Sequence, residues 1–244
     1  MIELKKNEIL DDLELDGLKI IQNREGYMFT SDAVVLSNFV FAKNSDKCAE
    51  IGSGNGVISI LVEHKNKPQK IYSFEIQKSL AEMSKRSVEY NNKQDTIEII
   101  NGKVQNFEKY IDKNSIDVVF SNPPYRKNNS LKGENKERNI CCFEETITLK
   151  ELCSIAYNML KDKGKFYIVY DATRSAELIY ELSNSKLEPK RMFYTAPSIE
   201  KSPVLILVEA VKNGKQGVKV LPQLITNDKD GKYINKLQTN YKKG

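Results

Sequence analysis

Apolar residues follow two alternating spacings through the middle of the chain. Short continuous apolar runs predict buried strands at Lys47–Ile51, Ile71–Glu75, Ile97–Ile100, Ile116–Phe120 and Lys165–Tyr170. Apolar residues at helical spacing between these runs predict helices at Val57–Lys65, Lys78–Asn91, Leu149–Lys161 and Arg174–Ser183. Apolar strands that alternate with helices are typical of a mostly parallel sheet with helices on both faces. The pattern therefore predicts an α/β fold.

The pattern changes at both ends of this region. The run "FTSDAVVLSNFVFA" places Thr30 or Ser31 as an N-cap before apolar residues at helical spacing, so it predicts a further helix. The runs "KRMFYTA" and "PVLILVEAV" have too little chain between them for a helix, and we expect an antiparallel hairpin at the sheet edge. Residues 212–244 are rich in lysine and turn signals, which fits either edge strands or a frayed tail.

Length and composition limit the classes of protein to which this chain can belong. A chain of 244 residues with 29% charged residues and a mean hydropathy of −0.51 suits one α/β domain. We expect one domain over residues 1–244, with a cap segment and helix at 1–45, a core at 46–211 and a basic extension at 212–244. The sequence shows no signal-peptide core and no run of about 18 apolar residues that could span a membrane. These features predict a soluble intracellular protein. We also expect it to be cytoplasmic and monomeric.

The cysteines do not indicate a metal site. Cys48, Cys141, Cys142 and Cys153 form no C-x-x-C pair, and their spacing to the single histidine, His64, suits no metal. We therefore expect four reduced thiols and no bound metal.

Positive charge gathers near the C-terminus. Residues 186–244 contain twelve Lys and Arg against five Asp and Glu, a net charge of +7, whereas residues 1–185 carry −2. This asymmetry indicates either a polyanionic partner or simply a solvated lysine-rich surface.

A glycine-rich turn follows the first predicted strand. In "CAEIGSGNGVISILV", Glu50, Gly52, Gly54 and Gly56 lie between that strand and the next helix. Glycine permits positive φ and close approach of a ligand to the backbone. Twenty-three residues after Gly52, Glu75 ends the second strand, where a carboxylate can accept hydrogen bonds from ribose hydroxyls. The glycines alone also fit a nucleotide oxidoreductase or a plain tight turn, but together with Glu75 they favour cofactor binding.

The fourth predicted strand ends in "SNPPY", with Asn122, Pro123, Pro124 and Tyr125. In an open α/β sheet, ligands bind at the carboxyl ends of the strands, so this motif should face the same crevice as the glycine turn. Two prolines fix φ and remove two N–H donors, which leaves a stiff loop. The pair also fits a simple end to a strand; the combination with the glycine turn favours a functional role.

The residue types of this loop suit a clamp for an amine. An aromatic exocyclic amine is a poor nucleophile because its lone pair is delocalised into the ring. The side-chain oxygen of Asn122 and the carbonyl of Pro123 can each accept one of its N–H bonds and direct its lone pair at a methyl donor. Tyr125 can stack on the base, a contact worth roughly 1–3 kcal/mol. Because a sulfonium is a good leaving group, positioning and charge stabilisation suffice without a strong general base.

The G-x-G-x-G spacing after an acidic residue resembles the S-adenosylmethionine-binding turn of Rossmann-like methyltransferases. Over roughly residues 14–220, the chain resembles the bacterial family that methylates the exocyclic N6 amine of adenine 37 in valine tRNA. The resemblance rests on "REGYMFTSDAVVLSNF", "AEIGSGNG", "SNPPY" and "LVEAVKNGKQG". It implies a seven-stranded sheet, tRNA as substrate and S-adenosylmethionine as cofactor. The implied cofactor contacts are Glu50, Gly52, Gly54, Gly56, Glu75, Ile76, Val104 and Asn122, with Phe29, Thr30 and Asp32 near its methionine end.

Two features depart from this family. Lys103 stands where relatives usually have an acidic residue against the cofactor adenine, so Asn101, Val104 or Asn106 takes over in our interpretation. The chain also has "NICCFEET" where relatives have an Arg-His-Glu run, so we expect details of the substrate to differ.

Basic residues after the tyrosine suggest how RNA is held. Residues 126–138 carry a net +3, and we expect this segment to be mobile until it grips phosphates. The predicted RNA contacts there are Arg126, Lys127, Lys132, Lys136 and Arg138. Further predicted contacts are Lys186, Lys190, Arg191, Lys201, Lys212 and Lys215.

Other functions stay open at this point. The same clamp suits a protein glutamine amide or a guanine amine of ribosomal RNA, although a glutamine methyltransferase would carry a longer helical N-terminal domain. A DNA adenine methyltransferase would need a target-recognition domain, and a tRNA chaperone without activity would not need Asn122 or Tyr125.

Overall fold

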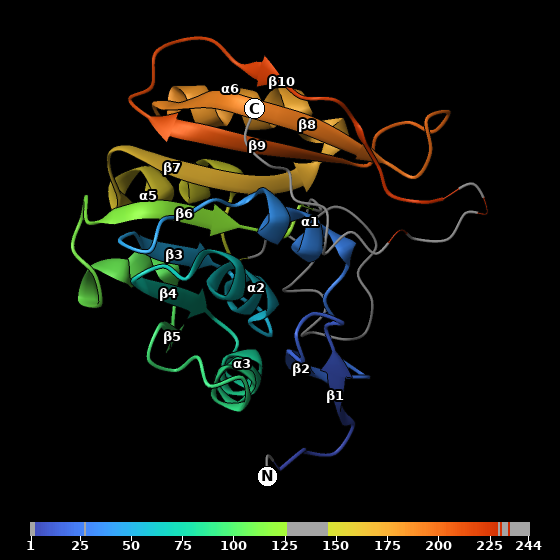
Figure 1. The fold of residues 1–244 in the computed structure, drawn as a ribbon. Coiled ribbons are helices and arrows are strands. Elements are labelled where there is room, and N and C mark those ends of the chain that lie inside the picture. Colours follow the sequence, from blue (N-terminus) through green and yellow to red (C-terminus); the bar gives the residue numbers. More distant parts are fainter. Residues whose placement is uncertain (1–2, 27, 126–145, 229, 231–233, 235–244) are drawn as a thin grey trace.

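A computed structural model describes residues 3–26, 28–125, 146–228, 230 and 234, and the structural statements below concern these residues. A nine-stranded sheet forms the centre of the molecule (Figure 1). Its order is β10-β8-β9-β7-β6-β3-β4-β5, and β11 also pairs with β8.

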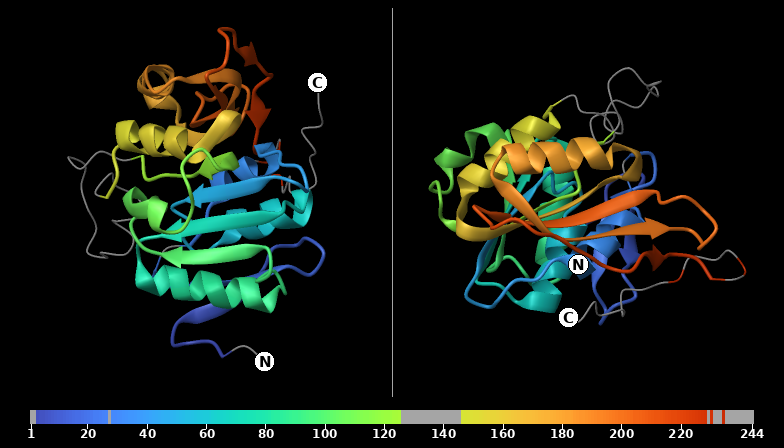
Figure 2. Two further views of the ribbon diagram at one scale, coloured as in Figure 1. Left: turned by 90° about the vertical axis from the view of Figure 1, so that its left-hand side faces the viewer. Right: turned by 90° about the horizontal axis from the view of Figure 1, so that it is seen from above.

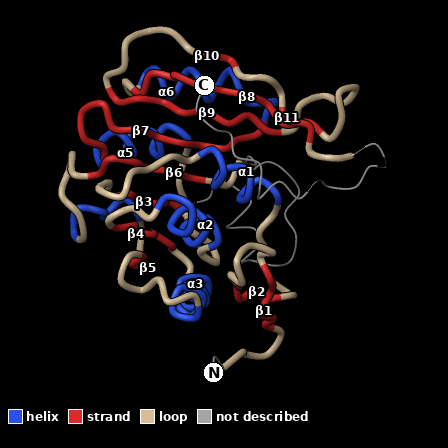
Figure 3. The backbone as a smooth tube through the Cα atoms, viewed as in Figure 1, coloured by secondary structure: helices blue, strands red, loops and turns tan. Residues whose placement is uncertain are grey.

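The predicted strands form the parallel part of this sheet. They are β3 (Lys47–Ile51), β4 (Lys70–Glu75), β5 (Ile97–Asn101), β6 (Ile116–Ser121) and β7 (Leu160–Asp171). The hairpin of β8 (Leu187–Ala196) and β9 (Leu205–Lys212) extends it, with β9 antiparallel to both β7 and β8. These seven strands confirm the predicted fold class. The short strands β10 (Lys219–Val220) and β11 (Leu224–Ile225) run along β8, so this part of the C-terminal extension is an ordered edge (Figure 3).

Helices cover both faces of the sheet, as the side view in Figure 2 shows. One face is covered by α1 (Ser31–Phe39), α2 (Val57–Asn66) and α3 (Lys78–Tyr90). The other is covered by α5 (Leu149–Met159), α6 (Ser175–Asn184) and the 3₁₀ helix η1 (Val104–Lys109). A second 3₁₀ helix, η2 (Ala172–Arg174), leads into α6.

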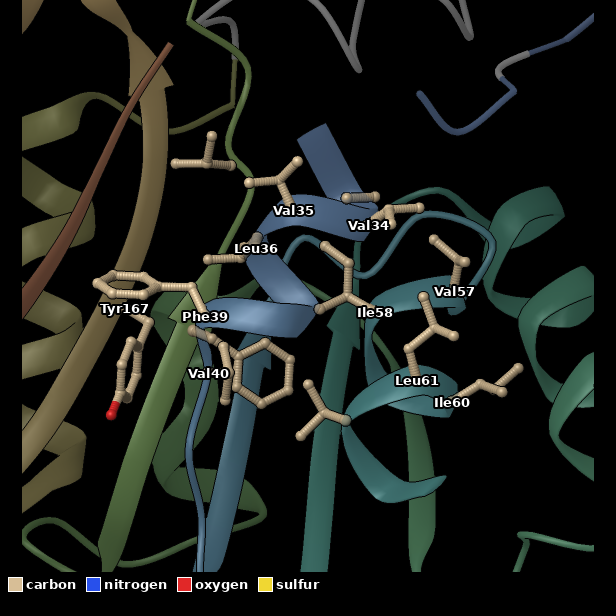
Figure 4. Packing of buried hydrophobic residues seen from close by; sticks show 14 of the residues in the cluster. Val34, Val35, Leu36, Phe39, Val40, Val57, Ile58, Ile60, Leu61 and Tyr167 are labelled. Carbon is tan, nitrogen blue, oxygen red and sulfur yellow. The ribbon is translucent and has the colours of Figure 1, made fainter. Parts of the chain in front are cut away.

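The helix α1 is fixed by apolar packing. Its side chains lie against those of α2 above the strands (Figure 4). Phe39 at its end meets Tyr167 of β7 edge-on, with ring centroids 5.5 Å apart, and such pairs contribute about 0.5–1.5 kcal/mol beyond their area. Thr30 is the N-cap, as predicted, but makes no capping hydrogen bond to the backbone. Packing therefore holds α1 over the end of the sheet where the candidate site lies.

The N-terminal segment contains a hairpin that the sequence pattern did not predict. β1 (Glu8–Asp12) and β2 (Lys19–Asn23) pair antiparallel, and Ile21 packs with Leu80 and Met83 of α3. Arg86 of α3 donates to both carboxylate oxygens of Glu8 at 2.6 and 2.8 Å. The hairpin is stabilised by these tertiary contacts, which local periodicity does not encode.

The junction of α5 and β7 differs from the prediction. The helix ends at Met159 and the strand begins at Leu160, two residues before the expected helix end and five before the expected strand start. Leu160 is extended and pairs with Ile116, and a register shift separates this pair from that of Val118 with Lys165. Tertiary pairing therefore overrides the helical period here.

Within the described residues, no helix is long and apolar enough to cross a membrane.

Candidate active site

A pocket lies at the carboxyl ends of β3, β4 and β6, the end of the sheet to which the arrows of these three strands point in Figure 1. The space within it, including space open to solvent, is about 700 Å³. Its lining combines the glycine turn after β3, the end of β4, the segment after β5 and the loop after β6. The described lining residues with predicted roles are Gly52, Gly54, Glu75, Ile76, Val104, Asn122, Pro123 and Pro124.

The glycine turn is left-handed at three positions. Gly52, Gly54 and Gly56 have φ of 77°, 56° and 87°, which residues with a Cβ rarely adopt. A Cβ on Gly52 would meet no atom within 4 Å, so open space faces this backbone. A Cβ on Gly56 would overlap the Ser84 hydroxyl of α3. Gly56 is therefore required for packing and is not among the residues that line the pocket, so its predicted cofactor contact is not supported.

Glu75 lies at the end of the neighbouring strand β4, and its carboxylate accepts backbone N–H groups near the pocket. Its Oε2 accepts the N–H of Gly54 at 2.8 Å, and its Oε1 accepts the N–H of Gln77 at 2.7 Å. Glu75 is also among the residues that line the pocket. The carboxylate is thereby oriented by backbone donors at the pocket wall.

Glu50 lies beneath the turn and not in the pocket. Its side chain is fully buried and accepts a hydrogen bond from Ser59 of α2. Burial raises the pKa of this carboxyl to about 8, so the protonated form prevails at neutral pH. Glu50 is not among the described residues that line the pocket, so its predicted cofactor contact stays a prediction.

The segment after β5 forms another wall. Lys103, Val104 and Gln105 line the pocket, so lysine does occupy the position that is usually acidic in the resembled family. The Asn101 amide instead donates to the carbonyls of Glu75 and Ile76 at 2.9 and 3.3 Å and ties β5 to the end of β4. Of the three residues proposed to take over from an acid, Val104 is the one among the lining residues.

The loop after β6 contributes Asn122, Pro123 and Pro124 to the same pocket. Tyr125 lies beside it, where its ring meets Tyr170 edge-on at a centroid distance of 6.1 Å. The Tyr125 hydroxyl donates to Oδ2 of Asp32 at 3.1 Å. The structure thus brings the predicted clamp and the glycine turn together, while the roles of these residues in binding stay predictions.

Asp32 connects α1 to the clamp. It is 6% exposed, and its carboxylate accepts hydrogen bonds from the hydroxyls of Thr30 and Tyr125. Burial raises its pKa above the usual value, although the hydrogen bond from Tyr125 opposes the shift. Among the described residues, Phe29, Thr30 and Asp32 are not part of the pocket lining.

Two residues at the site were not predicted. Arg174 of η2 donates to the Tyr125 carbonyl at 2.8 Å, pairs with Glu177 at 2.6 Å and lies 5.0 Å from the ring centroid of Tyr170. Gln22 of β2 is buried, and its Oε1 accepts the N–H of Phe29 at 3.0 Å. No local motif marked either residue. The contact of Arg174 with Tyr125 joins residues 49 apart, and Gln22 holds the backbone just before α1.

The predicted RNA contacts are scattered. Arg126, Lys127, Lys132, Lys136 and Arg138, and with them the predicted mobility of this segment, lie outside the described residues. Lys201 is exposed in the loop after β8, at the same sheet edge as the clamp.

The other basic residues fit RNA binding less well. Arg191 pairs with buried Glu209 at 3.1 Å, and Lys190 donates to the carbonyls of Lys215 and Gly217. Lys186 precedes β8, at the end of the sheet opposite to the clamp. Its carbonyl accepts the N–H of Asn213.

Lys212 corrects a prediction. Its ammonium is buried and donates to Asn114 Oδ1, the Tyr157 carbonyl and the Leu160 carbonyl at 2.6, 2.7 and 2.8 Å. An ammonium with three protein acceptors has no free donor for a phosphate. Its predicted contact with RNA is therefore wrong.

The described residues contain no group of three or more His, Cys, Asp or Glu that could hold a metal ion. Cys48 and Cys153 are buried free thiols.

Comparison with known proteins gives one family. The family model of the methyltransferase small domain matches residues 30–188. A relative from Dyadobacter fermentans called tRNA1(Val) (adenine(37)-N6)-methyltransferase is 25% identical over 203 residues, 82% of each chain. A relative of the same name from Bacteroides thetaiotaomicron is 26% identical and covers 68% of this chain and 74% of its own.

Solved structures share the fold. A predicted O-methyltransferase from Agrobacterium tumefaciens superposes with a TM-score of 0.69 at 17% identity, covering 86% of this chain and 98% of its own. TYW2 of M. jannaschii in complex with AdoMet superposes with a TM-score of 0.59 at 12% identity, covering 86% and 88%.

Proposed function

The chain belongs to the family of the methyltransferase small domain, and on this premise we propose that it methylates the exocyclic N6 amine of an adenine in tRNA. The proposed cofactor is S-adenosylmethionine and the proposed site is adenosine 37 of valine tRNA. The observation that carries the proposal is the single pocket lined by the glycine turn, Glu75 and the Asn-Pro-Pro loop. The names of the relatives from Dyadobacter and Bacteroides agree with it.

The residues present fit the cofactor. The backbone at Gly52 faces open space, so a ligand can approach it closely. Glu75 would hold the ribose hydroxyls, because two backbone donors fix its carboxylate at the wall of the pocket. Ile76 and Val104 would contact the adenine. Bound there, S-adenosylmethionine supplies a methyl group activated by its sulfonium.

The clamp residues act on the substrate amine. Asn122 Oδ1 and the Pro123 carbonyl each accept one N–H of the amine and point its lone pair at the methyl carbon. These preorganised acceptors would stabilise the positive charge that the nitrogen gains when it takes the methyl group and the C–S bond of the sulfonium breaks; the amine would then lose one proton to solvent. The ring of Tyr125 provides the surface on which the base stacks.

The tRNA must present its base outside the stack, which takes a few kcal/mol and less in a loop than in a duplex. Lys201 and the basic residues of 126–138 would contact the phosphates near the clamp. We further propose that the chain works in the cytoplasm as a monomer of one domain, without a metal.

The test is methyl transfer from labelled cofactor to tRNA of a strain that lacks this protein, followed by nucleoside analysis. Labelled N6-methyladenosine is the expected product, and mapping to position 37 of valine tRNA would follow. Label in ribosomal RNA or in a protein glutamine, with none in tRNA, would contradict the proposed substrate while leaving the amine clamp in place.

A further inference from the structure

The guanidinium of Arg174 is held in one orientation beside the clamp. Arg174 is the last residue of η2 and the N-cap of α6, and its side chain is 12% exposed. Its Nε and Nη2 donate to the two carboxylate oxygens of Glu177 at 2.9 and 2.6 Å. Two such bonds fix the plane of a guanidinium. The third nitrogen, Nη1, therefore has a defined direction, and it donates to the Tyr125 carbonyl at 2.8 Å.

Tyr125 is held by contacts from three elements. Its carbonyl accepts the bond from Arg174 of η2, and its hydroxyl donates to Asp32 of α1 at 3.1 Å. Its ring meets that of Tyr170 of β7 edge-on at a centroid distance of 6.1 Å. The guanidinium of Arg174 also lies 5.0 Å from the Tyr170 ring centroid, within the range of cation–π attraction. Arg174 thus contacts both the backbone of Tyr125 and the aromatic ring against which the Tyr125 ring packs.

We propose that Arg174 is a positioning residue that holds Tyr125 in the orientation in which its ring stacks on the target base. The inference rests on the proposed function and adds a residue that acts on the substrate through Tyr125. A fixed carbonyl fixes the backbone at Tyr125, and with it the direction in which the side chain leaves the backbone. A ring that is held before the substrate arrives does not have to be ordered when the base binds, and it presents the base in one alignment.

Two other roles explain these contacts less well. A direct contact with an RNA phosphate would need an accessible guanidinium, whereas that of Arg174 is largely buried and pairs with Glu177. A role in stabilising α6 alone would need only the pair with Glu177, three residues along the same helix. The bond to the Tyr125 carbonyl lies outside that helix, which favours a role in the clamp.

Arg174→Met tests the proposal because it removes the guanidinium and keeps an unbranched apolar side chain. We expect turnover at saturating cofactor and tRNA to fall about 10- to 100-fold, the effect typical of a misaligned substrate. Affinity for S-adenosylmethionine, measured by calorimetry, should stay within about twofold. Arg174→Lys keeps the charge but lacks the planar fork, so it should also lose turnover. Wild-type turnover in either variant would overturn the proposal.

Arg86→Met is the matched control. Arg86 of α3 also donates two bonds to one carboxylate, that of Glu8, and its side chain is 16% exposed. Its replacement removes an equivalent ion pair away from the clamp, so we expect lower thermal stability and unchanged turnover. An equal loss of turnover in Arg86→Met and Arg174→Met would reduce Arg174 to a stabilising residue and overturn the proposal.

Combination with Tyr125→Ala distinguishes positioning from a direct contact with RNA. If Arg174 acts through the Tyr125 ring, Arg174→Met should cost less than about threefold in turnover in the Tyr125→Ala background. Equal losses in both backgrounds would overturn the proposal. Loss of a phosphate contact would also lower the slope of log tRNA affinity against log salt by about one, whereas we expect the slope of Arg174→Met to equal that of the wild type.

A last measurement does not need the substrate. In protein labelled with 3-fluorotyrosine, the fluorine resonance of Tyr125 is identified by its absence in Tyr125→Phe. It should move toward the position of free 3-fluorotyrosine in Arg174→Met and stay in place in Arg86→Met. An unmoved resonance in Arg174→Met would overturn the proposal. If the wild type transfers no methyl group to tRNA, the proposed function fails, and this resonance still decides whether Arg174 holds Tyr125.

Discussion

Replacement of Glu75 by glutamine tests how the pocket holds its cofactor. Both carboxylate oxygens accept backbone N–H groups, from Gly54 at 2.8 Å and Gln77 at 2.7 Å. Glutamine has one acceptor oxygen, so its NH₂ group must oppose one of these donors or turn toward the ligand. A hydrogen bond to a charged group contributes about 1.5–3 kcal/mol, so loss of one such bond corresponds to roughly 10- to 100-fold weaker binding.

Calorimetry with S-adenosylmethionine and turnover at saturating cofactor together measure this effect. We expect the Kd for S-adenosylmethionine to rise roughly 10- to 100-fold. The kcat should stay within about threefold, because the Asn-Pro-Pro loop is unchanged. Glu98→Gln on the next strand is the control, since Glu98 is half-exposed and pairs with Lys70 at 3.4 Å outside the pocket lining. Equal Kd values for Glu75→Gln and the wild type would refute the assignment of Glu75 to the cofactor site.

Three further variants address the stability of the fold around the site. Lys212→Met leaves three buried acceptors without their donor, so we expect a loss of about 2–3 kcal/mol in denaturant unfolding. Its tRNA affinity should be unchanged, and weaker tRNA binding at wild-type stability would restore Lys212 as an RNA contact. Gly56→Ala forces a Cβ into a left-handed residue beside Ser84 and should lower stability by about 1–3 kcal/mol, measured in the same way. Glu50→Gln mimics the protonated acid. Because the pKa of Glu50 is raised from 4.5 to about 8, the native state of the wild type binds the extra proton and loses stability as pH rises between these values. The Tm advantage of Glu50→Gln should therefore grow from pH 5 to pH 8, and a constant difference would contradict the buried, protonated carboxyl.

Much of the sheet could be predicted because its strands are apolar on both faces. The run at Lys47–Ile51 matches β3 at both ends, and the edge hairpin follows from the short connection between its strands. The hairpin β1–β2 was missed because its pairing depends on α3, through Ile21 and the contact of Glu8 with Arg86. Local periodicity carries no information about such partners.

The candidate site also has features that the sequence could predict and features that it could not. Gly52 and Asn122 belong to motifs whose spacing places them at one sheet edge, and the pocket brings them together. The motif could not show that Glu50 is directed beneath the turn, because adjacent strand residues face opposite sides. Charge alone could not distinguish Lys201, which is exposed, from Lys212, whose ammonium donates hydrogen bonds to acceptors within the protein.

Turnover of Asn122→Ala on unmodified tRNA, measured together with its cofactor affinity, tests the central claim most directly. The account predicts that methyl transfer falls by about 100-fold or more, as when one preorganised group of a transition-state site is removed. Affinity for S-adenosylmethionine should stay close to that of the wild type. Methyl transfer at near wild-type rate by Asn122→Ala would contradict the amine clamp.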